Sequence, residues 1–138
     1  MAHIKRNNEY FFITYVVVKI LTGLFSYPKR NLRKLIRNGD FKEAIELGNN
    51  LEEKYSQDHD FLFIMGSMFY ILEDPKMTLH YVNRVLEINE YDVDALSLKL
   101  RVHQHLKEND TVIECCKKIL SVNSDNYEVK DILNELEG

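Results

Sequence analysis

Apolar residues recur along this chain at the spacing of α-helices, and the whole pattern returns every 34 residues. The segment 66–89 is followed 34 residues later by a second copy that ends at 123, and stepping back by 34 finds a third across 39–51. Within each copy the apolar positions lie three or four residues apart, which predicts helices with one buried face. A fixed period of this length indicates that one structural unit is stacked several times.

The aligned copies agree in chemistry, position by position, without insertion or deletion. Ala44, Thr78 and Val112 share one column of small residues. Two further columns are aliphatic: Ile45, Leu79 and Ile113, then Leu51, Val85 and Ile119. A helix with a single apolar face cannot bury that face alone, so we expect the copies to stack and to share one core.

Residues that favour helix starts mark the beginning of several of these helices. Asp40 followed by Glu43 fits a capping box, and Asp74 precedes a proline suited to a first helical turn. Asp125 with Glu128 predicts a last helix, whose one apolar face suits a cap on the final repeat. Each copy is therefore expected to be two helices joined by a short turn.

These features resemble the tetratricopeptide-repeat family in period and in signature residues. Gly66 with Phe69, and Gly39 leading to Ala44, fit the small and aromatic positions of that repeat. The resemblance implies an all-α, right-handed superhelix of antiparallel helix pairs. The expected units are the repeats 25–58, 59–92 and 93–126, a capping helix over 127–138, and an apolar N-terminal segment over 1–24.

Some positions depart from the family pattern. His103 stands where a large apolar residue is expected, Leu100 replaces the glycine-like position, and Gly48 lies where an aromatic residue is usual. We expect these residues to weaken packing locally without changing the register.

The resemblance further implies that a peptide or helix of a partner binds in a concave groove lined by the first helix of each repeat. The expected partner-binding residues are Lys29, Arg33, Arg37, Phe63, Ser67, Tyr70, Arg101 and His105. Arg and Lys pair with carboxylates, while Phe and Tyr offer apolar area, so an acidic and apolar partner is expected. Of the family's five-residue clamp for chaperone tails, only Lys29 and Arg101 match, so an intact clamp is not expected.

Residues 10–25 are apolar almost all round a helix and leave three readings open. The residues expected to insert or dock are Phe11, Phe12, Val16, Val17, Lys19, Ile20 and Leu24. As a membrane anchor, a helix of this length spans about 24 Å against a hydrocarbon core of about 30 Å, and Lys19 adds a further cost. It can instead pack on the first repeat in place of a missing second helix, or mediate oligomerisation.

Charge is distributed unevenly along the 138 residues, which form one domain. Residues 1–37 hold eight Lys or Arg and one acid, a net charge of +7, which leaves −11 for the remainder. Such asymmetry indicates either an anionic partner for the basic end or simple complementarity with the acidic body.

The sequence contains no arrangement typical of an enzyme, a metal site or a cofactor site. His103 and His105 are two residues apart and point to different sides of a helix. Cys115 and Cys116 are adjacent and have no other cysteine to pair with, which favours packed thiols in a reducing, cytoplasmic compartment. No nucleic acid is expected as a partner.

These observations predict a protein-interaction scaffold or adaptor, with association at a membrane surface as one form of it. The alternative is a structural or assembly subunit of a membrane complex, anchored by its N-terminal helix.

Overall fold

The computed structural model describes residues 13–14, 17 and 27–138. Over this part the chain forms seven labelled α-helices and no strands, which confirms the predicted all-α repeat fold. The helices are α2 (Pro28–Asn38), α3 (Phe41–Leu51), α4 (His59–Ile71), α5 (Pro75–Ile88), α6 (Val93–His105), α7 (Asn109–Val122) and α8 (Tyr127–Glu137).

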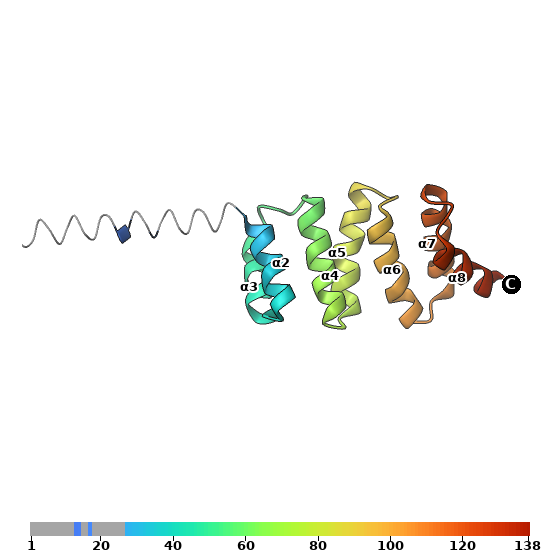
Figure 1. The fold of residues 1–138 in the computed structure, drawn as a ribbon, viewed down its shortest axis with the longest axis horizontal. Helices are drawn as coiled ribbons and strands as arrows, with labels where there is room; N and C mark the ends of the chain where they lie inside the picture. Colours follow the sequence, from blue (N-terminus) through green and yellow to red (C-terminus); the bar gives the residue numbers. More distant parts are fainter. Residues whose placement is uncertain (1–12, 15–16, 18–26) are drawn as a thin grey trace, which may run out of the picture.

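The helices stand in antiparallel pairs that follow one another along one axis (Figure 1). α2 pairs with α3, α4 with α5, and α6 with α7, while α8 closes the row. We call α2, α4, α6 and α8 the first helices. α2 contacts α4 and α4 contacts α6, so these helices form a continuous layer. We call the face of α2, α4 and α6 that points away from their partners α3, α5 and α7 the first-helix surface.

The repeated columns occupy equivalent places in the core. Ala44, Thr78 and Val112 are all fully buried, as the 34-residue alignment predicts. Burial of one position in every unit shows that the apolar faces are shared between neighbouring pairs rather than exposed.

The turn inside each helix pair has the same backbone conformation. Gly39, Glu73 and Lys107 have φ values of 79°, 57° and 58°, in the left-handed region. In each turn this residue donates its N–H to the carbonyl three residues earlier, and the next residue donates to the carbonyl five residues earlier. These bonds satisfy carbonyls at the helix end, but only the first turn uses the glycine that the conformation favours.

The helix starts confirm one predicted cap and correct two. Asp74 accepts a hydrogen bond from the N–H of Met77 at 3.0 Å, as expected. The side chain of Asp40 makes no capping hydrogen bond, so the predicted capping box is wrong in that respect. The last helix is capped by Asn126 and not by Asp125: the Asn126 side chain accepts from the N–H of Val129 at 3.1 Å.

Two departures from the family pattern are absorbed by their neighbours. His103 is buried, and its Nδ1 lies 2.6 Å from a carboxylate oxygen of Glu108. A Cβ added to the buried Gly48 would lie 2.5 Å from the sulfur of Met65, so the Met65 side chain fills the space that a larger residue would take.

The expectations for residues 10–25 fall almost wholly outside the described residues. Of the residues expected to insert or dock, only Val17 is described, and it is exposed. The others are Phe11, Phe12, Val16, Lys19, Ile20 and Leu24. Within the described ranges, no helix combines the length and the apolar character that crossing a bilayer requires.

Candidate functional site: the first-helix surface

Two of the predicted partner-binding cations form ion pairs at the start of α4. The Nζ of Lys29 lies 3.1 Å from Asp58 and 3.4 Å from Asp60, and the guanidinium of Arg33 lies 2.5 Å from Asp60. Its hydrogen bond to Asp58 raises the pKa of the Lys29 ammonium above the usual value. The third predicted cation of this helix, Arg37, is exposed and forms no ion pair within the described part of the chain.

Asp58 serves both as the cap of α4 and as the partner of Lys29. It accepts the N–H of Phe61 at 2.8 Å. Burial by itself would raise the pKa of the Asp58 carboxyl, but the hydrogen bond from Phe61 and the ammonium of Lys29 together hold it below its usual value. Asp58 is therefore a fixed, charged link between α2 and α4.

Arg101 forms an ion pair equivalent to that of Arg33, two repeats further along the chain. Its guanidinium lies 3.2 Å from Glu128 in α8, 27 positions ahead, which is the separation that also joins Arg33 to Asp60. All four of these side chains are substantially exposed. Exposed pairs of this kind contribute about 0–1 kcal/mol, so they arrange charge on the surface more than they stabilise the fold.

The middle of the first-helix surface has no such pair. A step of 27 positions from Ser67 leads to Asp94, and neither residue forms an ion pair among the described residues. Phe63 is only half-buried and packs against the core cluster of the first two helix pairs. Phe63 therefore serves packing and leaves part of its ring on the surface.

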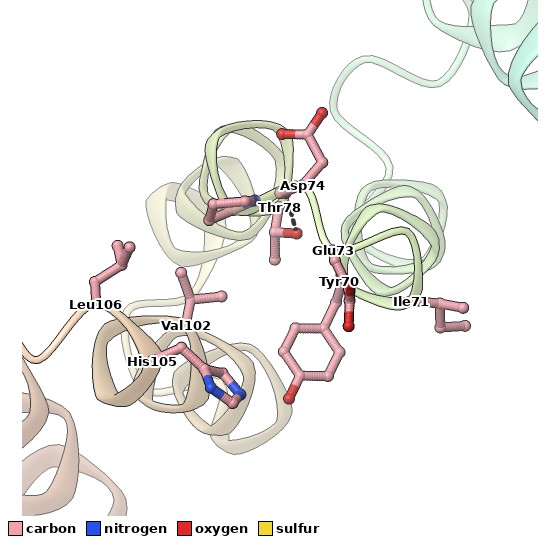
Figure 2. Close-up of a pocket in the computed structure, with 9 residues that line it drawn as sticks. Tyr70, Ile71, Glu73, Asp74, Thr78, Val102, His105 and Leu106 are labelled. Atoms are coloured by element: carbon pink, nitrogen blue, oxygen red, sulfur yellow. Dashed lines mark hydrogen bonds between the residues drawn. The ribbon is translucent and has the colours of Figure 1, made fainter.

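A hollow of about 510 Å³ lies where α4 and α6 end, and it brings two predicted residues together. Figure 2 shows Tyr70 of α4 and His105 of α6 projecting into the same space. Most of the lining is apolar. The lining residues are Tyr70, Ile71, Glu73, Asp74, Pro75, Thr78, Val102, His105 and Leu106.

The floor of the hollow is fixed by buried groups, while its edges stay in contact with solvent. Thr78 is fully buried and donates its hydroxyl to the carbonyl of Asp74 at 2.7 Å, and Val102 is buried beside it. At the edge, Leu106 is 44% exposed, whereas the exposed side chain of Ile71 projects away from Tyr70 and His105 (Figure 2). An exposed aliphatic side chain at the edge of a rigid recess is typical of a surface that receives an apolar side chain of a partner.

Several parts of this surface were not predicted from the sequence. Glu73 and Leu106 lie in turns, outside the helix positions from which the groove was inferred. The acids that pair with the cations were also missed, although a 34-residue column of acids, Asp60, Asp94 and Glu128, was available as a signal. The predicted cations are thus already paired, except for Arg37.

Polar clusters elsewhere hold helices together. Tyr81 donates its hydroxyl to Glu52 at 2.9 Å, and Arg84 pairs with the same carboxylate, which joins α5 to the end of α3. Burial, and then the hydrogen bond to Glu52, raise the pKa of Tyr81 to about 12. In the described part of the chain, no group of three or more His, Cys, Asp or Glu residues is arranged to hold a metal ion.

Cys115 and Cys116 are free and buried in α7. Burial raises the pKa of the Cys115 thiol to about 11 and also raises that of Cys116. Because the thiolate is the reactive form, both groups are suited to packing rather than to nucleophilic chemistry.

Comparison with solved structures identifies the fold. The chain is similar to the first TPR domain of Spaghetti (RPAP3), solved bound to the HSP90 peptide SRMEEVD, with a TM-score of 0.70 and 15% identity over 80% of this chain and 87% of that one. For the first TPR domain of human RPAP3 the TM-score is 0.67, with the same identity and coverage. For MamA protein it is 0.59, with 20% identity over 82% and 70% of the two chains.

The likeness confirms a tetratricopeptide-repeat fold, as the 34-residue period predicts. No protein-family model matches the sequence, and no curated protein matches it either.

Proposed function

We propose that this protein is a non-enzymatic interaction scaffold that binds a segment of a partner protein across the first-helix surface. The observation that carries the proposal is the hollow between the ends of α4 and α6, where Tyr70 and His105 stand over a buried floor and Leu106 is left exposed at the edge. A stack of helix pairs holds such a surface rigid, so little ordering is needed when a partner binds.

The proposed partner segment has an apolar anchor with carboxylates beside it. The anchor would fill the hollow, and the carboxylates would meet Arg33 or Arg101. These two are paired with Asp60 and Glu128, but exposed pairs are worth only about 0–1 kcal/mol, so exchanging one carboxylate for another costs little.

One similar structure supports this chemistry. The peptide bound to the TPR domain of Spaghetti, SRMEEVD, carries three acidic residues around Met and Val. The family's clamp for such a peptide is not reproduced in this chain, because only Lys29 and Arg101 match it and both are engaged in ion pairs.

The test is recovery of partners on the full-length protein, with wild type compared with two serine variants. Leu106→Ser removes an exposed aliphatic group from the edge of the hollow. Ile88→Ser removes a similar group, 45% exposed, from the end of α5 and serves as the matched control. Burying a fully exposed leucine contributes about 1.5–3 kcal/mol. Because Leu106 is 44% exposed, Leu106→Ser should weaken capture about three- to tenfold.

The proposal predicts that the Ile88→Ser control captures the same partners as wild type. Equal capture by wild type and Leu106→Ser would show that the hollow does not bind the partner. A double neutral variant, Arg33→Gln with Arg101→Gln, then tests the carboxylate part. It is preferable to charge reversal, which would place a new carboxylate beside Asp60 or Glu128.

A further inference from the structure

The first helix of each pair turns one face toward the preceding pair, and α6 shows which positions form that face. Ala95 and Leu98 of α6 belong to the core cluster built otherwise from α2–α5 and the Tyr55 turn, and Val102 meets Thr78 and Tyr70 of the preceding pair around the hollow. Residues three and seven positions apart share one side of a helix. These three positions therefore mark the stacking face of a first helix.

The stacking face of α4 follows the same rule. Its equivalent residues, 34 positions earlier, are Phe61, Ile64 and Met68, and all three are buried. In both units the stacking face is apolar and covered by the pair before it.

The equivalent positions of the first unit are not apolar. A further step of 34 positions gives Tyr27, Arg30 and Lys34, and all three are exposed. An apolar helix placed on this face would bury two cations without partners, which is strongly unfavourable. The stacking face of α2 is therefore unsuited to another repeat helix, and its chemistry calls for an anionic partner.

The cations on this face form an unbroken stripe. Arg30, Lys34 and Arg37 follow one another at spacings of four and three residues, and α2 contains no acidic residue. Among the described residues none of the three takes part in an ion pair, whereas Lys29 and Arg33 on the α4 side are both paired. We call Arg30, Lys34 and Arg37 the end stripe.

We propose that the end stripe binds the anionic surface of a lipid bilayer. Two observations favour a bilayer over other polyanions. The stripe follows within five residues of the apolar segment 10–25, and apolar insertion combined with a basic patch is what holds a protein stably at a membrane surface. It also lies on the end helix of an elongated row, so a flat surface can meet the stripe without approaching the acidic body (Figure 1).

This surface is separate from the hollow between α4 and α6, so the proposal does not rest on partner capture there. The test is co-sedimentation of the full-length protein with vesicles. One set contains phosphatidylcholine alone, and the other contains about 30 mol% phosphatidylserine, the anionic lipid that attracts basic segments. The variant is Arg30→Gln with Lys34→Gln and Arg37→Gln. A matched control, Lys42→Gln with Lys54→Gln and Lys76→Gln, removes three positive charges from α3, the turn after it and α5.

Wild type should bind the anionic vesicles about 100-fold more tightly than the neutral ones. This is the combined attraction expected when three cations each lie near an anionic lipid surface. The end-stripe variant should lose most of that difference, and the control should keep it. Raising the salt from about 0.1 M to about 0.5 M should weaken only the anionic binding. Circular dichroism checks that both variants stay helical, and Arg30→Lys with Arg37→Lys should bind like wild type.

Equal binding of wild type to the two vesicle types would overturn the proposal, as would wild-type affinity in the end-stripe variant. Binding of the stripe to a soluble acidic protein or to RNA, with none to anionic vesicles, would assign it to another partner and overturn it equally.

Discussion

Replacing Tyr81 by Phe removes one buried hydroxyl and leaves the rest of its surroundings in place. The ring stacks on Phe69 with centroids 5.8 Å apart, and the Arg84 guanidinium lies 5.3 Å from the ring centroid. The hydroxyl donates to Glu52 at 2.9 Å, across the junction between the first two helix pairs. The variant therefore tests how much one hydrogen bond contributes to joining two repeats.

A hydrogen bond to a charged acceptor contributes about 1.5–3 kcal/mol. Glu52 keeps its ion pair with Arg84 in the variant, so the loss of stability should lie at the lower end of this range. We expect Tyr81→Phe to reduce the free energy of unfolding by about 1–2 kcal/mol at about pH 8.

The difference should shrink in alkali, because the folded protein holds the Tyr81 proton more tightly than the unfolded chain. The pKa of Tyr81 rises from 10.0 in a model tyrosine to about 12 in the fold. The associated stability is complete below the unfolded pKa and is lost as the pH rises through the folded one. At about pH 11 wild type has lost about 1.4 kcal/mol through this group, and the Phe variant has no such group to titrate.

The assay is urea unfolding followed by helical circular dichroism at about pH 8 and about pH 11. Subtracting the two proteins at each pH cancels the titration of every shared group. Tyr91→Phe is the control, because that side chain is exposed and makes no bond to Glu52. A gap between wild type and Tyr81→Phe that stays constant over this range would refute the assigned proton affinity. A gap near zero at both pH values would refute the hydrogen bond.

Three further predictions concern the turns, the last cap and the thiols. Glu73→Gly should raise the free energy of unfolding by about 0.5–1 kcal/mol, measured in urea. Glycine removes the strain of the left-handed backbone at this position, and that gain exceeds the cost of the greater conformational entropy of the unfolded chain. Asn126→Ala should lower the stability of α8 by about 1 kcal/mol, and Asp125→Ala should lower it much less, because Asn126 caps the helix. Hydrogen exchange of the α8 amides measures both, and equal losses of stability would contradict Asn126 as the cap. Cys115 and Cys116 should react with a thiol reagent at about pH 8 only after unfolding, because a pKa of about 11 leaves about one thiolate in 1,000 for Cys115; rapid labelling of the native protein would contradict their burial.

The sequence by itself determined the repeat and its core. A column such as Ala44, Thr78 and Val112 must keep similar size and burial in every unit, because each helix pair hides its apolar face against a neighbour of the same shape. This constraint appears as a fixed spacing of similar residues, so the sequence alone predicts it. The Asp74 cap is equally local, since its hydrogen bond spans three residues.

Only the tertiary structure decided which side chains meet across units. Lys29 with Asp58, Arg33 with Asp60 and Arg101 with Glu128 join residues 27 to 29 positions apart, so their contact depends on how one pair is rotated on the next. The hollow beside Tyr70 and His105 depends on the same rotation. Periodicity fixes which face of a helix is buried, but the angle between stacked pairs is set by packing over the whole row, and that angle brings distant polar groups together.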